Sequence, residues 1–333
     1  MDPKISLEEL SKTSFIKCDY IDDRLIPLQS CFNDDHEWET WFPGPNGLMR
    51  IKGSMVEGSY FAKDIAEKGD GFIAFNNFMM KRAYFNNVVG FVHGIMEDIH
   101  NLGASIGKIN LLHEVWRDDH SRVSRRYVAS EVEYIFSTCR SVFDLLQEVI
   151  YRLWRRFRYL DKNKKTKSLK RSFPKMVLRG DRILSVEEIE KKYLIPEELA
   201  RFYYKQAGFF LWLRDYRDRI AHGGKGFKHV LILEKGFAVP IDEEPFDSLC
   251  IWNEANTSSD NRRLGSLRSV VAHVCLNTIK AMEEYTHVIS SIMEMPYDIA
   301  PDYLVFERGG HISDLIEAKK YISDEPWVSE LST

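Results

Sequence analysis

The sequence has few of the residue patterns that mark metal sites, disulfide frameworks or nucleotide-binding loops. Its five cysteines lie at least 13 positions apart, so neither a zinc-binding pair nor a disulfide framework is indicated. Its ten histidines show no metal-ligand spacing such as HExxH. There is no glycine-rich phosphate loop, and we expect no GxSxG elbow, which argues against the common hydrolase type. We therefore expect no metal and no cofactor.

Long hydrophobic runs are also missing. No apolar run approaches the ~20 residues that a membrane-spanning helix needs. The first residues contain no basic region followed by an apolar run, so we expect no signal peptide. The sequence therefore predicts no membrane segment and a cytoplasmic location.

The chain does contain enough apolar residues for a large core. Of its 333 residues, 44% are hydrophobic and 13% are aromatic, as in a soluble globular protein. The net charge is −4, so the protein as a whole is not a polycation. Binding to nucleic acid would therefore need a local basic patch.

Long amphipathic stretches predict a mainly α protein. Apolar residues recur at three- and four-residue spacing over residues 71–115, 127–160, 196–222 and 264–294. A separate helix is also plausible near residues 106–116. The stretch HVLILEKGFAVPI favours a small β-hairpin inserted between the last two long helices. We therefore expect a helical bundle with a β-hairpin insertion.

The ends of the chain have a less regular pattern. Aromatics, prolines and glycines in the first 70 residues predict turns with short strands, an irregular α+β N-terminal region. Its aromatic residues, Trp38 among them, suit a sensor pocket, an interface or plain core. We expect an N-terminal region over residues 1–120, a helical domain over 121–295 and a tail over 296–333. The tail is expected to be irregular apart from a short helix near its middle.

One short stretch concentrates charge. Residues 214–222, RDYRDRIAH, hold three arginines, two aspartates and one histidine in nine residues. In a helix of about 100° per residue, Arg214, Asp218 and His222 lie on one strip, with Arg217 on the same side. A structural interpretation is equally open. Basic residues stabilise the negative end of a helix, and four-apart ion pairs are ordinary on helix surfaces.

Residues 217–222, RDRIAH, followed by Gly223, resemble the Arg-x4-6-His motif of the HEPN superfamily. In that family the motif lies near the end of a helix in a helical bundle, and the predicted helices of residues 125–295 follow a similar order. The resemblance implies a metal-independent endoribonuclease that acts as a homodimer, with two copies of the motif facing each other across a two-fold interface. Many members of the family are toxins or defence effectors of bacteria, and others only bind RNA or partner proteins.

The chemistry of RNA cleavage suits these residue types. RNA carries its own nucleophile, the 2′-OH, so a catalyst must remove its proton, stabilise the phosphorane and protonate the leaving 5′ oxygen. We assign acid–base catalysis to His222, because imidazole titrates near neutral pH. Arg217 offers a fork of donors for the non-bridging oxygens. Asp218 would orient Arg217 or His222, and Arg214 would assist phosphate binding.

Two positions depart from the common family pattern. Gly224 stands where a subset of members carries a tyrosine that a partner nucleotidyltransferase modifies, so we do not expect that toxin–antitoxin arrangement. Asp218 stands where asparagine is commoner, and it puts a negative charge near the phosphate. The family often adds a polar residue from the first long helix. Candidates are Glu133, Arg140 and Asp144, although each also suits a solvent-facing helix surface.

A basic segment precedes the motif helix. Residues 152–182 hold 13 Lys or Arg and 2 Asp, a local charge of +11. Such a segment can bind an RNA backbone by releasing counterions, and interleaved aromatics can stack on bases. The alternative is a solvated loop that contributes only solubility. The predicted RNA-binding residues are Arg155, Arg156, Arg158, Lys162, Lys164, Lys165, Lys167, Lys170 and Arg171.

The favoured hypothesis is thus a HEPN-type endoribonuclease with a toxin or defence role, which binds RNA and leaves a 2′,3′-cyclic phosphate. One alternative is a non-catalytic HEPN-like module that binds RNA or protein. Another is a ligand-sensing protein whose sensor is formed by residues 1–115. The RNA target and any antitoxin or activator are not specified by the sequence.

Overall fold

The computed structural model describes residues 4–5, 30–33, 35–44, 47–53, 55–82, 87–120, 123, 125–155, 160, 166–223, 230–258, 263–295 and 303–321. The side chains of residues 4–5, 41–44, 47–52 and 219–223 are not described. The described residues form a mainly α protein, which confirms the predicted class.

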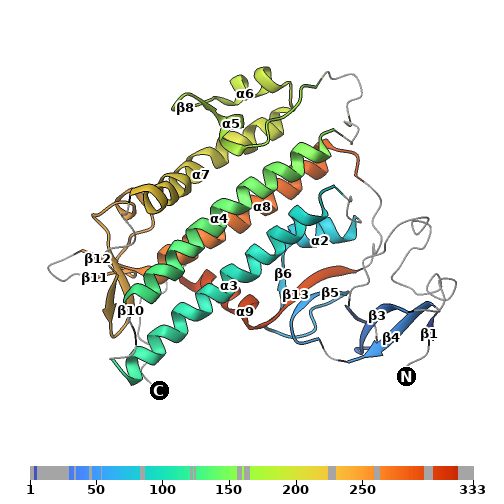
Figure 1. Ribbon diagram of the computed structural model, residues 1–333, viewed down its shortest axis with the longest axis horizontal. Coiled ribbons are helices and arrows are strands. Elements are labelled where there is room, and N and C mark those ends of the chain that lie inside the picture. Colours follow the sequence, from blue (N-terminus) through green and yellow to red (C-terminus); the bar gives the residue numbers. More distant parts are fainter. Residues whose placement is uncertain are drawn as a thin grey trace.

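The longest helices of the described chain lie side by side in a bundle (Figure 1). Helix α4 packs against α3, α7 and α8, and α7 also packs against α8. Each helix buries the apolar stripe that its sequence periodicity indicates, which removes that stripe from water. The bounds are α3 (Val89–Asp118), α4 (Arg125–Leu153), α7 (Glu197–Gly223) and α8 (Leu267–Ile292).

The predicted helix boundaries need correction in two places. The stretch 71–115 is two helices, the short α2 (Ala74–Lys81) and the long α3, so the separate helix expected near 106–116 is part of α3. Helix α4 ends at Leu153 rather than near residue 160. Just after its end, the Trp154 indole Nε1 donates to the Lys167 carbonyl at 3.0 Å, so the chain is turned back onto the helix.

The N-terminal region contains a seven-stranded sheet, which is more regular than predicted. Its order is β1-β4-β3-β2-β5-β13-β6, and every pair is antiparallel except β2 with β5. The strands are β1 (Lys4–Ile5), β2 (Ser30–Phe32), β3 (Trp38–Gly44), β4 (Gly47–Lys52), β5 (Gly58–Ala62), β6 (Gly71–Phe72) and β13 (Leu304–Arg308).

Strand β13 comes from the predicted irregular tail, and that prediction is wrong for these five residues. It lies between β5 and β6, with Phe306 opposite Tyr60 on one side and Phe72 on the other. The short helix expected later in the tail is confirmed as α9 (Gly310–Glu317), followed by the 3-10 turn η3 (Ala318–Tyr321). The proposed boundaries at residues 120 and 295 stay a prediction.

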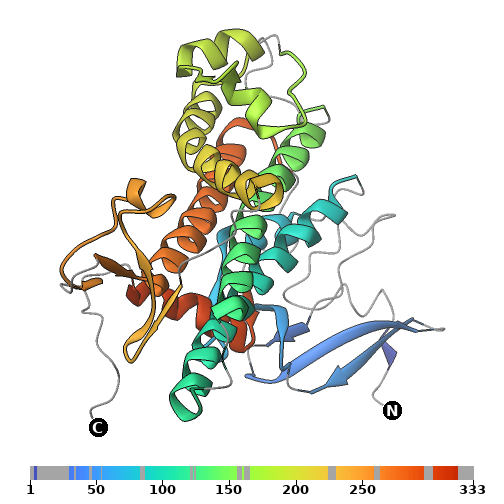
Figure 2. The ribbon, with the colours of Figure 1, turned by 60° about the vertical axis from the view of Figure 1, so that its left-hand side comes forward.

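The predicted β-hairpin is confirmed as β9 (Leu231–Leu233) and β10 (Gly236–Pro240), which belong to a four-stranded sheet. Its other strands are β12 (Leu264–Ser266), beside β10, and β11 (Thr257–Ser258). Figure 2 shows this insertion and the N-terminal sheet on opposite sides of the bundle. The shorter elements are α5 (Phe173–Val177), β7 (Leu178–Arg179), β8 (Arg182–Ile183), α6 (Val186–Tyr193) and η2 (Phe246–Ser248).

Candidate functional site

The candidate site lies in the last three turns of α7, counted to Gly223. The helix runs on to Gly223, so the motif sits near a helix end, as predicted. The side chains of Arg214, Arg217 and Asp218 are described, whereas those of residues 219–223, His222 included, lie outside the described side chains. The role of His222 therefore stays a prediction.

Asp218 is shared by two arginines. Its Oδ1 lies 3.1 Å from Arg217 Nη1 and its Oδ2 lies 3.4 Å from Arg214 Nε. All three side chains are about two-fifths exposed, at 39%, 41% and 39% for Arg214, Arg217 and Asp218. Burial raises the pKa of Asp218, but the hydrogen bonds from Arg217 and Arg214 outweigh it, and the pKa is lowered. The carboxylate is thus ionised at neutral pH and holds two guanidinium groups toward solvent.

Helix α4 adds a second ion pair to this surface. Arg140 Nη1 lies 2.8 Å from Asp144 Oδ2. Burial raises the pKa of Asp144, and the positive charges of Arg140 and Arg217 act against that rise. Two of the three α4 candidates thus form an ion pair with each other on the helix that packs against α7.

The third α4 candidate, Glu133, lies near the ring that supports the motif. Burial, together with the negative charge of Glu133, raises the pKa of Tyr216. The Tyr216 ring lies 4.4 Å from the Phe136 ring, and Phe136 also contacts Trp212 at 5.2 Å between ring centroids. Trp212 Nε1 donates to the Pro245 carbonyl at 3.2 Å. These contacts fix the apolar side of α7, so its arginines remain on the outer side.

The basic residues are described only in part. Arg156, Arg158, Lys162, Lys164 and Lys165 lie outside the described residues, whereas Arg155, Lys167, Lys170 and Arg171 are described. The described part packs against the helical bundle. Leu169 is buried, and the Lys170 carbonyl accepts a hydrogen bond from Gln147 Nε2 of α4 at 2.5 Å. Residues 166–171 are therefore anchored to the bundle at Leu169 and Lys170, and the choice between RNA binding and a role in solubility stays a prediction.

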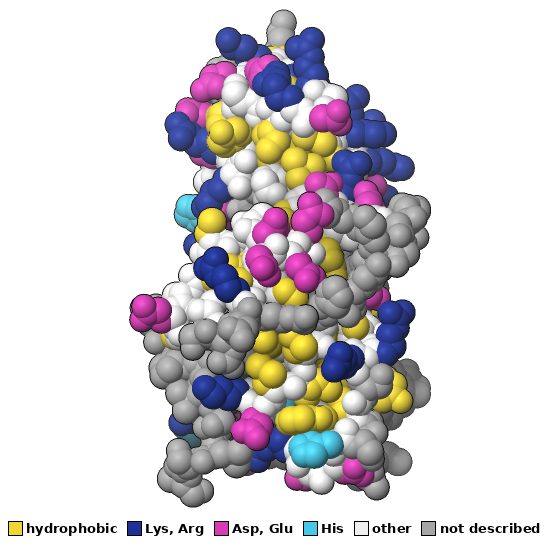
Figure 3. Space-filling model, turned by 90° about the vertical axis from the view of Figure 1, so that its left-hand side faces the viewer, with side chains coloured by type: hydrophobic (Ala, Val, Ile, Leu, Met, Phe, Trp, Pro, Cys, Tyr) yellow, Lys and Arg dark blue, Asp and Glu magenta, His cyan; other side chains and the backbone are white. Residues whose placement is uncertain are grey.

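The structure does not bring the basic residues and the motif into one site. Gln147, which holds Lys170, also accepts from the Tyr203 hydroxyl at 2.9 Å, close to the start of α7. Arg217 lies 14 residues further along that helix, which is roughly 20 Å at the helical rise. The two groups thus lie at opposite ends of the α4–α7 pair. Figure 3 shows lysines and arginines gathered toward the upper end of the molecule and acidic side chains across the middle of the same face.

A GxSxG pattern is present at residues 103–107, GASIG, and sequence reasoning missed it. It lies inside α3 and not on a strand-to-helix turn. Ser105 is fully buried. A Cβ added at Gly103 would lie 2.1 Å from the backbone oxygen of His311 in α9. The two glycines therefore serve close helix packing.

The N-terminal aromatic residues that are described form a row across one face of the sheet. Trp38 contacts Phe32 and Tyr60, with ring centroids 5.0 and 4.9 Å apart, and Tyr60 contacts Phe306 at 5.7 Å. Tyr60 and Phe306 are buried, so this part of the row is core. The side chains of Trp41 and Phe42 lie outside the description.

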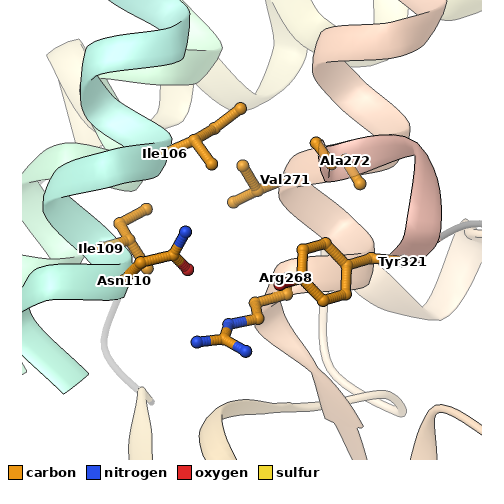
Figure 4. Close-up of a pocket in the computed structure, with 8 residues that line it drawn as sticks. Ile106, Ile109, Asn110, Arg268, Val271, Ala272 and Tyr321 are labelled. Carbon is orange, nitrogen blue, oxygen red and sulfur yellow. The ribbon is translucent and has the colours of Figure 1, made fainter. Parts of the chain in front are cut away.

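Two hollows of the described structure lie away from the motif. The larger has a cavity volume of about 260 Å³ and is lined by Phe32, Asn33, His36, Lys63, Asp64 and Ile65. A crevice between α3, α8 and η3 has a cavity volume of about 10 Å³, enough for one water molecule (Figure 4). Within the described residues, no group of three or more potential ligands could hold a metal ion. No helix in that part of the chain is both long enough and apolar enough to cross a membrane.

Comparison of the chain with protein-family models, with curated protein sequences and with solved structures finds no match. The HEPN resemblance consequently rests on the motif and its setting, and the function is argued from the site itself.

Proposed function

We propose that this chain is a metal-independent endoribonuclease of the HEPN type, which cleaves RNA through 2′-OH attack and leaves a 2′,3′-cyclic phosphate. The observation that carries the proposal is the arrangement of Arg214, Arg217 and Asp218. Two guanidinium groups reach solvent side by side at a helix end, and one ionised carboxylate fixes both. Such fixed cations suit a phosphate whose charge grows in the transition state.

The reaction can be assigned to named positions. Arg217 and Arg214 bind the non-bridging oxygens, because guanidinium groups form paired hydrogen bonds with phosphate. Position 222 follows Asp218 by four residues in a continuous helix, which places it on the same strip. There, the imidazole of His222 takes the 2′-OH proton as the O2′–P bond forms. The P–O5′ bond then breaks, and the 5′ oxygen takes a proton from an imidazolium.

The proposal includes the family's assembly and biology. A homodimer formed through the motif face would place two such clusters in one cleft, and the exposed ends of Arg214 and Arg217 leave that face open in the described chain. The proposed role is that of a toxin or defence effector in the cytoplasm. Sedimentation of the purified protein measures the assembly directly, and a monomer at all concentrations would contradict it.

A second candidate function is a non-catalytic HEPN-like module that binds RNA or a partner protein. The observation in its favour is the same carboxylate, because Asp218 already occupies the arginines that a phosphate would need. Asp144 adds a second negative charge on the facing helix. In this function, RNA would bind and stay intact, and binding would survive His222→Ala.

Cleavage of an unstructured RNA in the presence of EDTA tests the proposal. Wild type should cleave and leave 2′,3′-cyclic ends, whereas Arg217→Ala should be slower by about 100- to 1000-fold because a transition-state donor is lost. His222→Ala should be inactive. The matched control is Arg201→Ala, which removes a 68%-exposed arginine of the same helix that pairs with Glu197.

Cleavage that survives in both motif variants would reject the site. Intact RNA that is still bound by wild type would favour the non-catalytic module. Equal loss in Arg201→Ala and Arg217→Ala would point to a nonspecific charge effect and not to the site.

A further inference from the structure

The outer surface of α4 connects the motif with the described basic residues. At about 100° per residue, Arg140, Asp144, Glu148 and Tyr151 fall within one arc of roughly 80°, and Arg155, just after the helix end, lies beside the Tyr151 ring. All five are partly or fully exposed. On one side of this arc, Leu145 faces Gly94 of α3, and on the other, Phe143 contacts Phe209 and Phe210 of α7. We call these five residues the α4 strip. Figure 1 shows that α4 lies between α3 and α7.

The motif lies at one end of the α4 strip. Tyr216 of the motif stretch contacts Phe136 of α4, with ring centroids 4.4 Å apart, and Arg140, one turn after Phe136, pairs with Asp144 at 2.8 Å. Arg140 Nε is buried and has no hydrogen-bond partner among the described atoms. The cations at this end therefore come from both α4 and α7.

The other end of the α4 strip is an aromatic ring between cations. The guanidinium carbons of Arg155 and Arg171 lie 5.6 and 5.2 Å from the centroid of the Tyr151 ring. Glu148 pairs with Arg152 at 3.2 Å and with Arg171 at 3.8 Å. The single carboxylate here is thus used by two arginines, and the positive charge is in excess. Arginine planes and a tyrosine ring are the groups on which unpaired bases stack.

The distance between the two ends of the α4 strip sets the length of RNA that could contact both of them. Tyr151 follows Arg140 by 11 residues, or about 16 Å along the helix. A strand with its phosphate at Arg217 would therefore reach Tyr151 only after some intervening nucleotides. A base in a duplex is paired and stacked within its own helix, so it is not available to a flat ring on a protein surface.

We propose that the α4 strip is a track for single-stranded RNA, in which Tyr151, Arg155 and Arg171 form a base-stacking subsite for a nucleotide away from the cleaved bond. This inference rests on the proposed function for the position of the cleaved phosphate. The substrate of the motif site would then be single-stranded RNA that is long enough to contact both ends of the α4 strip. A dinucleotide would reach only the motif.

Binding and cleavage measured separately test the track. The probes are a fluorescein-labelled, unstructured 12-nucleotide RNA, the same strand in a duplex, and the dinucleotide UpA. Tyr151→Leu keeps an apolar side chain but removes the ring, and Tyr151→Phe restores the ring. Arg155→Gln with Arg171→Gln tests the cations without touching the ring. Circular dichroism of each variant checks the fold.

The track predicts a specific pattern. Tyr151→Leu should weaken binding of the 12-nucleotide strand about tenfold, because stacking on an aromatic ring accounts for that order of affinity per base. Tyr151→Phe should bind as wild type does, and the double arginine variant should bind more weakly and with a smaller dependence on salt concentration. Tyr151→Leu should raise KM for the long strand and leave kcat unchanged. Cleavage of UpA should not depend on Tyr151.

The outcomes separate the track from the ribonuclease activity. If RNA stays intact but the binding pattern holds, the activity is rejected and the track stands. If Arg217-dependent cleavage is found and Tyr151→Leu binds the strand as tightly as wild type, the track is rejected and the activity stands. Duplex binding equal to that of the single strand also rejects the track.

Discussion

Two carboxylates of this protein each accept hydrogen bonds from several donors, but one of them is buried and the other is partly exposed. Glu307 on β13 is fully buried and receives hydrogen bonds from Ser59 Oγ at 2.8 Å and Asn76 Nδ2 at 2.7 Å. His100 Nε2 lies 3.1 Å from its second oxygen. Asp218 is 39% exposed, and both of its donors are arginines of its own helix. The first arrangement joins four distant elements, whereas the second arrangement is local.

The difference separates a structural site from a candidate binding site. Removing one partner from a buried, charged network leaves the remaining polar groups without water or partners, which is costly. An exposed ion pair contributes little to stability, because water screens it. The arginines of Asp218 are therefore not needed to hold the fold and are available to a ligand. The Glu307 network, by contrast, fastens β13 to β5, α2 and α3.

The largest expected effect is on the free energy of unfolding, after removal of the buried carboxylate of Glu307. Glu307→Ala should lower the free energy of unfolding by about 3–5 kcal/mol, because Ser59, Asn76 and His100 would be left unpaired in the core. Urea denaturation followed by circular dichroism measures it. Glu197→Ala, which breaks an exposed pair with Arg201, is the matched control. Similar losses in the two variants would remove the distinction between the sites.

A smaller effect concerns two histidines next to Glu307, whose rings lie 4.8 Å apart. For His100, burial lowers the pKa, but the hydrogen bond and charge of Glu307, with Glu97 and Glu57, raise it above 6.5 overall. For His311, burial and the charge of His100 lower the pKa below 6.5, against Glu57, Glu307 and Glu97. The stability from His100 is present below its unfolded pKa and is lost as pH rises through the folded pKa. The stability from His311 is present above its unfolded pKa and is lost as pH falls.

Titration of the imidazole protons by NMR checks this prediction. The two rings should titrate on opposite sides of the ordinary value of 6.5. In Glu307→Gln, the pKa of His100 should fall, because its charged partner is gone. Two rings that titrate together near the ordinary value would show that the Glu307 network does not hold His100 in its charged form.

The smallest expected effect on the free energy of unfolding concerns the partly exposed carboxylate of Asp218. Asp218→Asn should change the free energy of unfolding by less than about 1 kcal/mol at pH 7, because the pair is partly exposed. The pKa of Asp218 is lowered in the folded state, so its contribution is present above the unfolded pKa and is lost as pH falls through the folded pKa. Thermal melts at pH 7 and pH 3 measure both points. A loss as large as that of Glu307→Ala would mean that the motif is structural.

Much of the candidate site could be predicted because its geometry is local. The four-residue spacing of Arg214 and Asp218 places them together on any helix, and the structure shows them paired. The packing of α4 beside the motif helix was expected only from a family resemblance, since nothing in the spacing brings two helices together. The distance between the motif and the basic residues could not be predicted, because it depends on how α4 and α7 pack side by side.

Sequence by itself determined the long helices and the polar strip of α7, because hydrophobic periodicity and helix geometry act over a few neighbouring residues. Only the tertiary structure decided that β13 completes the N-terminal sheet and that Glu307 is buried against Ser59, a residue 248 positions away. It also decided that α9 packs closely against α3 at Gly103 and Gly107. The physical reason is the same in each case. Strand pairing, burial of charge and close helix packing depend on contacts between residues far apart in the chain, and a local sequence pattern does not predict such contacts.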